Sequence, residues 1–224
     1  MKINIAIDGP GAAGKSTIAK CLAKKLNYVH LDTGAMYRST AYKALQNHIS
    51  LEDEEAVCKM LENTKIQLAT DGSIFLDGED VSDKIRTNEI SLAASLVSKL
   101  ANVRRMLVER QQEMAKEKGF IMDGRDIGTV VLKDAEVKIY MTATPMARAK
   151  RRYDQNIAQN IPTGSIEEIA REIAESDLQD MTRENSPLKK ADDVVESDTS
   201  DMSIDEVTEY IYSLAKPFIE KEVL

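Results

Sequence analysis

A glycine-rich stretch near the N-terminus constrains this chain more than any other feature. Residues 9–17 read GPGAAGKST and fit the pattern G-x-x-x-x-G-K-[ST]. Residues 3–7 before it alternate apolar and polar side chains as a strand does, and residues 16–26 after it carry apolar side chains at helical spacing. A strand, a glycine-rich turn and a helix in this order are typical of a phosphate-binding loop, or P-loop. We therefore expect residues 9–17 to hold the phosphates of a nucleotide.

The residue types in this loop suit an anion. Glycine permits backbone angles that turn successive N–H groups inward, and the following helix N-terminus adds to the attraction. Lys15 supplies a cation for the outer phosphates, and the Ser16 hydroxyl can bind Mg²⁺. A turn that merely joins a strand to a helix is the alternative, which the full pattern disfavours. The predicted nucleotide-binding residues are Gly9, Pro10, Gly11, Ala12, Ala13, Gly14, Lys15, Ser16 and Thr17.

Length and composition narrow the class of protein. The 224 residues suit a single domain over 1–224. We find no apolar leader and no stretch long enough to cross a membrane, so we expect a cytoplasmic protein with no membrane partner. The net charge of −8 argues against a nucleic-acid partner. Cys21 and Cys58 form no C-x-x-C pair, so neither a zinc site nor a disulfide is expected. The absence of coiled-coil heptads favours a monomer.

Short apolar runs alternate with helical segments along the chain. This alternation predicts an α/β fold with three αβα layers, in which helices cover both faces of a five-stranded parallel sheet. The five runs are residues 3–7, 28–31, 120–122, 137–141 and 194–195.

One region interrupts the alternation. Residues 65–70 and 73–76 are strand-like and flank the Asp-Gly dipeptide at 71–72, and a second Asp-Gly follows at 77–78. Asp-Gly between alternating apolar residues is a strong hairpin signal. We therefore predict a small antiparallel insertion between the second and third core strands.

Helix signals fill much of the remaining chain. Residues 103–116 are amphipathic, and capping boxes at 165–168 and 203–206 open two later helices. We expect the helix from 165 to end at Pro187. Residues 154–164 are polar and contain a proline and a glycine, so we expect a mobile loop between two helices.

Charged residues follow two of the predicted strands. The second strand leads into LDTGAMYR at 31–38, and the third into DGRD at 123–126. Ligands of open α/β sheets bind outside the carboxyl ends of strands, so we expect Arg38 to face the P-loop. Asp32 and Asp123 are expected to organise metal-bound water. Arg125 can fork onto phosphate oxygens. A simple surface turn is the alternative for DGRD.

A basic segment follows the fourth predicted strand. Residues 144–152 read TPMARAKRR, and if Pro145 begins a helix, Arg148 and Arg152 share one face. Arginines next to a hinged loop are suited to a lid that closes during phosphoryl transfer. A solvated basic face is the alternative reading.

Taken together, these motifs resemble those of bacterial cytidylate kinases, within the nucleoside monophosphate kinase family, over nearly the whole chain. The resemblance implies a P-loop NTPase fold with a monophosphate-binding region at about 34–110 and a short lid at about 150–166. The insertion near 65–80 resembles the enlarged monophosphate-binding region of the bacterial enzymes. The motifs that carry the resemblance are GPGAAGKST at 9–17, LDTGAMYR at 31–38, IRT at 85–87, GRDIGTVV at 124–131 and SPL at 186–188.

The resemblance implies transfer of the γ-phosphoryl group of ATP to CMP or dCMP, with Mg²⁺, to give CDP or dCDP and ADP. The positions matching groups that hold the acceptor phosphate are Thr33, Arg38 and Arg125. Those matching groups near the cytosine are Ser95, Arg104 and Asp126. Those matching groups near the ribose and phosphates are Asp180 and Arg183. Ser176 stands where the family often has an arginine, a departure at one acceptor contact.

The choice of base also follows from hydrogen-bond chemistry. Cytosine carries an amino donor where uracil has a carbonyl, and Asp126 can accept from that donor. Facing uracil, the carboxylate would lose a partner at a cost of about 1–3 kcal/mol, which is a ten- to hundredfold preference. The acceptor phosphate is already an anion, so no general base is needed. Catalysis would consist of positioning and charge neutralisation by Mg²⁺ and by Lys15, Arg38, Arg125, Arg148 and Arg152.

Three other functions remain open. The first is a related kinase for UMP, dTMP, AMP or a non-nucleotide hydroxyl. The second is a GTP-binding switch, which would be expected to carry Asn-Lys-x-Asp, a tetrapeptide absent from this sequence. The third is a catalytically inactive ATP-binding module, which the presence of Lys15, Ser16 and Asp123 disfavours.

Overall fold

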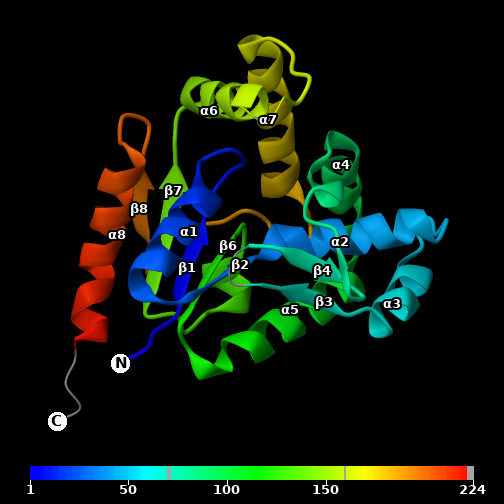
Figure 1. The fold of residues 1–224 in the computed structure, drawn as a ribbon, viewed down its shortest axis with the longest axis horizontal. Coiled ribbons are helices and arrows are strands. Elements are labelled where there is room, and N and C mark those ends of the chain that lie inside the picture. The colour runs from blue at the N-terminus through cyan, green and yellow to red at the C-terminus, as the bar shows by residue number, and fades with distance from the viewer. Residues whose placement is uncertain (70–71, 159, 221–224) are drawn as a thin grey trace. The chain divides into compact units, whose positions relative to one another are not determined.

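The computed structural model describes residues 1–69, 72–158 and 160–220. It contains a five-stranded parallel sheet in the order β2-β6-β1-β7-β8 and a three-stranded sheet in the order β3-β4-β5 (Figure 1). The strands of the larger sheet are β1 (Ile5–Asp8), β2 (Val29–Asp32), β6 (Phe120–Gly124), β7 (Val137–Thr142) and β8 (Val195–Asp198). The predicted parallel core sheet is therefore confirmed, and each of its strands coincides with one of the five apolar runs or overlaps it.

Strand β1 lies at the centre of this sheet. Ile5 is paired in parallel register with Ile121 of β6 and with Val137 of β7. A central parallel strand is covered on both faces, and Ile5 and Ile7 are accordingly fully buried. Because β1 runs directly into residues 9–17, the P-loop begins at the carboxyl end of the central strand.

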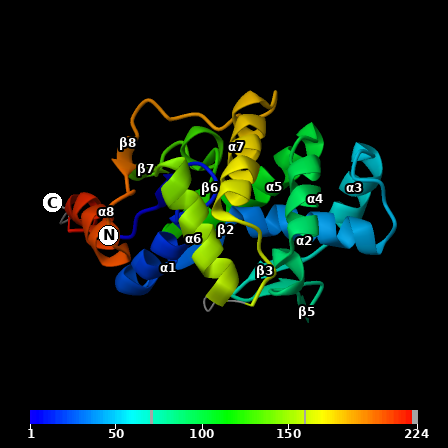
Figure 2. The same cartoon turned by 90° about the horizontal axis from the view of Figure 1, so that it is seen from above.

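The chain forms two compact units, residues 29–117 and the remainder. The helices of the remainder are α1 (Lys15–Leu26), α6 (Pro145–Ala158), α7 (Ile166–Thr182) and α8 (Ile204–Ile219), with a π-helical turn η3 (Ile127–Val131). Leu22 of α1 and Ile211 of α8 belong to one core cluster with the side chains of β1 and β7. Figure 1 shows these two helices beside the strands, and Figure 2 shows α6 and α7 next to each other.

The unit formed by residues 29–117 contains the predicted insertion. Its helices are α2 (Thr33–Gln46), α3 (Glu54–Glu62), α4 (Asn88–Val97) and α5 (Ala101–Met114), with the 3₁₀ turns η1 (Lys84–Arg86) and η2 (Ala115–Glu117). The antiparallel strands are β3 (Ile66–Leu68), β4 (Ile74–Leu76) and β5 (Glu79–Asp80).

The second Asp-Gly dipeptide forms the turn between β4 and β5. Asp77 and Gly78 have φ values of +52° and +92°, as a two-residue hairpin turn with two left-handed residues requires. This prediction is confirmed. At the first dipeptide, Asp71 lies outside the described residues, as does Thr70 before it.

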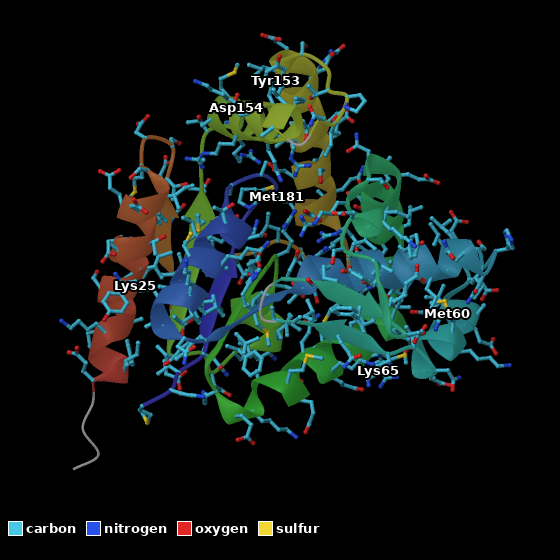
Figure 3. The ribbon with its side chains drawn as sticks, viewed as in Figure 1. Lys25, Met60, Lys65, Tyr153, Asp154 and Met181 are labelled. Atoms are coloured by element: carbon cyan, nitrogen blue, oxygen red, sulfur yellow. The ribbon has the colours of Figure 1, made fainter. Side chains whose placement is uncertain are left out.

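Helix starts were predicted more accurately than helix ends. Both capping boxes are present, at Ser165 and at Ser203. The expected loop over 154–164 is wrong at its start, because α6 continues to Ala158 and Asp154 projects from that helix (Figure 3). Polar composition alone does not stop a helix, and the first proline after Pro145 is Pro162.

The expected end of α7 at Pro187 is also wrong. The helix ends at Thr182, and Arg183 takes an extended backbone with ψ of 143°. The N–H of Leu188 then donates to the carbonyl oxygen of Asp180 at 2.7 Å. The helix therefore ends before the proline, and the chain turns back on the helix end through Pro187. Among the described residues, no helix combines the length and the apolar character that a membrane crossing requires.

Candidate functional site

The P-loop can be built only with glycine at its first position. Gly9 has a φ of +146°, and a Cβ atom there would lie 2.0 Å from the carbonyl oxygen of Met141 in β7. Gly14, just before α1, has a φ of +93°, in the left-handed region that favours glycine. The loop thus leaves β1 tightly against the neighbouring strand and enters α1 through a left-handed residue.

The side chain of Lys15 is buried within this loop. Its Nζ donates to the carbonyl oxygen of Pro10 at 2.7 Å. Burial lowers the pKa of Lys15 to about 7, and the nearby Arg125 guanidinium adds to this effect, whereas Asp123 opposes it. The structure places the predicted phosphate-binding cation within the loop.

Ser16 and Asp123 lie together, as a magnesium site requires. The Ser16 hydroxyl donates to Oδ2 of Asp123 at 2.6 Å. Asp123 is paired in register with Ile7, so the β6 carboxylate lies beside the end of β1. A hydroxyl and a carboxylate are the oxygen ligands that Mg²⁺ takes in nucleotide sites. The chemistry of these two residues fits the ion.

Three predicted acceptor residues form one cluster beside the loop. Nε of Arg125 donates to Oδ2 of Asp180 at 2.7 Å, and Nη1 of Arg183 lies 3.4 Å from Oδ1 of the same carboxylate. A Cβ on Gly11 would lie 3.6 Å from Nη2 of Arg125. Arg125, Asp180 and Arg183 therefore lie together, with Arg125 next to the P-loop.

The arginines of α6 differ in their surroundings. Arg148 is buried and donates from Nη1 to the carbonyl oxygen of Gly11 at 3.0 Å and to Oδ2 of Asp177 at 2.6 Å. Arg151 donates to the carbonyl oxygen of Ala13 at 3.1 Å. Arg152 is exposed on α6. Two α6 arginines thus contact backbone oxygens of the P-loop.

Sequence reasoning missed Arg151 and Asp177. Oδ1 of Asp177 accepts the N–H of Gly11 at 3.2 Å, so this carboxylate and Arg148 together bind both polar backbone groups of one loop glycine. The i, i+3 spacing of Arg148 to Arg151 is a recognised neighbour relation on a helix and could have indicated the second arginine.

Asp8 was also missed. This residue ends β1, is 4% exposed, and accepts the N–H groups of Ile127 at 2.8 Å and Gly128 at 2.7 Å. Burial raises the pKa of Asp8 to about 6; the two N–H bonds act in the opposite direction, and the Asp126 carboxylate adds to the rise. The available signal was an acid at the end of an apolar strand, directly before the glycine loop.

In the unit of residues 29–117, the predicted residues at the start of α2 lie together. Asp32 caps the helix by accepting the Ala35 N–H at 3.0 Å, and Oδ2 of Asp32 accepts from Nη2 of Arg38 at 2.8 Å. Burial tends to raise the pKa of Asp32, but Arg38 and His30 outweigh it and hold this pKa below its ordinary value. Thr33 is buried as the first residue of α2.

The predicted base-contacting residues of this unit lie around the connection between α4 and α5. The Arg104 guanidinium is buried 5.4 Å from the ring centre of Tyr37 and donates to the Ser98 carbonyl oxygen at 3.1 Å. The Ser98 hydroxyl in turn donates to the carbonyl oxygen of Ser95 at 2.9 Å. Ser95 and Arg104 are therefore linked through Ser98.

Comparison with known proteins gives one consistent family. The sequence model of the family described as cytidylate kinase matches residues 5–217. A cytidylate kinase of Geobacillus sp. (strain WCH70) is 50% identical over 215 residues, which cover 95% of this chain and 96% of the relative. A cytidylate kinase of Caldicellulosiruptor bescii is 50% identical over 225 residues, covering 99% of each chain.

A solved structure supports the fold. The crystal structure of shikimate kinase from Bacteroides thetaiotaomicron aligns with a TM-score of 0.51 at 11% identity, over 96% of this chain and 99% of that one. At this low identity the likeness concerns the fold alone. It agrees with the predicted P-loop kinase architecture.

Proposed function

Since the chain belongs to the cytidylate kinase family, we propose that it transfers the γ-phosphoryl group of ATP to CMP or dCMP, giving CDP or dCDP and ADP. The observation that carries this proposal is the cluster of Lys15, Ser16, Asp123 and Arg125 around the P-loop in a chain of this family. It supplies the cations and oxygen ligands that phosphoryl transfer needs.

The donor half of the site is proposed to be the P-loop. Residues 9–17 would hold the ATP phosphates with backbone N–H groups, and Lys15 would neutralise the outer phosphates. Ser16 would bind Mg²⁺ directly, with Asp123 and Asp32 acting through water. When bound, the ion neutralises charge on the phosphates. The 2.6 Å bond between Ser16 and Asp123 supports this assignment.

The acceptor half is proposed to consist of three groups of residues. Thr33, Arg38 and Arg125 would hold the phosphate of CMP, which attacks as an anion and needs no general base. The cytosine would contact Ser95, Arg104 and Asp126. The ribose and phosphates would contact Asp180 and Arg183, which lie beside Arg125.

We propose that residues of about 34–110 bind the monophosphate and that about 150–166 act as the lid of a single kinase domain. From this lid and the adjoining part of α6, Arg152 and Arg148 would neutralise charge on the transferred group. The acidic net charge of −8 supports small nucleotides rather than nucleic acid as partners. We further propose a cytoplasmic monomer.

A coupled assay of ADP release tests the function. The purified chain is given MgATP and, separately, CMP, dCMP, UMP, dTMP and AMP. We expect the highest kcat/KM with CMP or dCMP, and about ten- to hundredfold less with UMP, because uracil leaves the Asp126 carboxylate without its donor. Best turnover with UMP or AMP would contradict the assignment. Equal ADP release without any acceptor would indicate an ATPase instead.

A further inference from the structure

Asp8 connects the P-loop to the turn that carries Asp126. It directly precedes Gly9, and each of its two carboxylate oxygens accepts one backbone N–H: Oδ1 from Ile127 at 2.8 Å and Oδ2 from Gly128 at 2.7 Å. These two N–H groups open the π-helical turn η3. The buried carboxylate therefore fixes the start of this turn relative to β1.

The backbone that Asp8 binds continues directly from Asp126. Asp126 is the residue immediately before η3, with φ of −143° and ψ of 26°, and it is 6% exposed. Its carbonyl oxygen accepts the Val130 N–H at 2.9 Å, inside the same turn. A shift of the Ile127 and Gly128 peptides would consequently move the Asp126 carboxylate.

A carboxylate suits this position better than an amide does. Asp carries two acceptor oxygens and no donor when ionised, whereas Asn replaces one oxygen with an NH₂ group. In an Asp8→Asn protein, that NH₂ would face the N–H of Ile127 or Gly128, and a buried N–H would lose its partner. The Asp8 carboxylate and the Lys138 side chain both pack against this turn, since a Cβ at Gly128 would lie 3.4 Å from Oδ2 of Asp8 and 3.3 Å from Cδ of Lys138.

Two charged groups, Asp126 and Lys15, act on the Asp8 carboxylate. The Asp126 carboxylate repels that of Asp8, while the Lys15 ammonium attracts it. Holding two buried carboxylates near each other is unfavourable, and the paired N–H bonds of Asp8 offset part of this cost. The two N–H bonds thus hold the Asp8 carboxylate in place despite its repulsion by Asp126.

We propose that Asp8 is a positioning residue for base selection: by holding the Ile127 and Gly128 N–H groups, it sets the Asp126 carboxylate where it accepts from the amino group of cytosine. The proposal rests on the proposed function, since it needs a CMP acceptor read by Asp126. It assigns Asp8 a role in discriminating the acceptor base although Asp8 belongs to the strand that leads into the donor loop.

The test is the ratio of kcat/KM for CMP to kcat/KM for UMP at saturating MgATP in Asp8→Asn. We expect this ratio to fall about tenfold, equivalent to the loss of one well-formed hydrogen bond in discrimination. Both constants come from one preparation, so the ratio is independent of the fraction of active protein. A variant that folds poorly therefore still reports on selectivity.

A double-mutant cycle shows whether Asp8 acts through Asp126. Asp126→Asn alone is expected to lower the ratio, and adding Asp8→Asn to it is expected to lower the ratio no further. A structural defect unrelated to Asp126 would instead lower the ratio independently in both backgrounds.

Asp177→Asn is the matched control. It is the same chemical change in a carboxylate that also accepts a backbone N–H, that of Gly11, but it contacts the P-loop and Arg148 rather than η3. We expect it to raise KM for ATP and to leave the CMP to UMP ratio unchanged.

An unchanged ratio in Asp8→Asn, additive effects in the cycle, or an equal fall in Asp177→Asn would each overturn the proposal. These results differ from failure of the proposed function, in which the unmodified protein itself does not phosphorylate CMP.

Discussion

Two ionisable groups next to the P-loop have pKa values far from their ordinary ranges, in opposite directions. Lys15 is lowered to about 7 and Asp8 is raised to about 6. Burial is the first cause in both, because it disfavours whichever form is charged. Burying the charged form of either group therefore costs folding free energy. Lys15 needs its charged form to bind phosphate, and Asp8 needs its charged form to accept two N–H groups.

The pH dependence of stability should reveal the burial of Asp8. Its folded pKa of about 6 lies above the ordinary value of 3.8, so the folded state holds a proton that the unfolded state has lost between these values. Stability from this group therefore falls as pH rises through the window, by about 3 kcal/mol at most. The difference in unfolding free energy between the unmodified protein and Asp8→Asn, measured with urea at pH 4.5 to 7, should shift in favour of the variant.

Titration of the other groups largely cancels in this difference. The charged groups facing Asp8 are Asp126 and Lys15, so Asp126→Asn provides the control: removing its repulsion should make the shift smaller. A difference that does not vary with pH would show that Asp8 titrates normally.

The site residues predicted from the sequence belong to recognisable motifs. The carboxylates that were not predicted bind backbone N–H groups. Lys15, Ser16 and Asp123 follow from a pattern and from strand ends. Asp8 and Asp177, in contrast, bind backbone N–H groups of η3 and of the P-loop. Every residue except proline carries a backbone N–H, so the sequence does not indicate which N–H group a carboxylate will bind. These contacts can be identified only from the folded structure.

At the scale of elements, the junction of β1 and the P-loop restricts most strongly which residue can be substituted. Replacing Gly9 with alanine would put a Cβ atom 2.0 Å from the Met141 carbonyl oxygen, and neither backbone can move without disturbing the pairing of β1 with β7. We expect Gly9→Ala to lower the free energy of unfolding by more than about 3 kcal/mol, measured by urea denaturation.

Gly78→Ala is the matched control, since it also has a positive φ, of +92°, but nothing lies within 4 Å of the added Cβ. Only the backbone strain remains there, at about 1 kcal/mol. Equal losses in the two variants would mean that the close approach to β7 does not matter.

Helix boundaries can be predicted from sequence patterns only where the boundary has a local signal. The starts of α7 and α8 carry capping boxes, a local signal that the sequence contains in full. The end of α7 depends instead on the bond from the Leu188 N–H to the Asp180 carbonyl, a contact across eight residues. Helix α6 extends to Ala158, beyond the predicted start of the loop at residue 154. The prediction relied on the polar composition of this segment, but polar residues such as those at 154–156 are compatible with a helix.

For the whole molecule, alternating strands and helices predict the parallel sheet, and the Asp-Gly hairpin signals predict its antiparallel insertion. The alternation by itself does not divide the chain into two compact units, because that division depends on which residues of 29–117 and of the remainder contact one another. Sequence periodicity reports the face that an element buries and says little about which elements share one core.

Ligand binding should stabilise the folded molecule by an amount that grows with the logarithm of the ratio of ligand concentration to Kd. At about 100 times its Kd, CMP would add about 2.7 kcal/mol, which for a chain of this size raises Tm by roughly 5–10 °C. UMP at the same concentration should produce a smaller shift, and cytidine, which lacks the phosphate for the arginines, a smaller one again. Thermal unfolding followed by circular dichroism measures all three. Equal shifts with CMP and UMP would argue against selection of the base at the binding step.

Met1 lies at α8, near the last residues that the structure describes. The amino group of Met1 donates to the carbonyl oxygen of Ile219 at 2.6 Å, and Figure 2 shows the N-terminus beside this helix. A short peptide linker could therefore close the chain into a ring, and the ring could be reopened at Gly78, where the turn faces open space. In such a circular permutant β1 would become an internal segment of the polypeptide while remaining the central strand of the sheet. We expect the P-loop of such a permutant to keep its position, because the pairing of β1 with β6 and β7 sets that position.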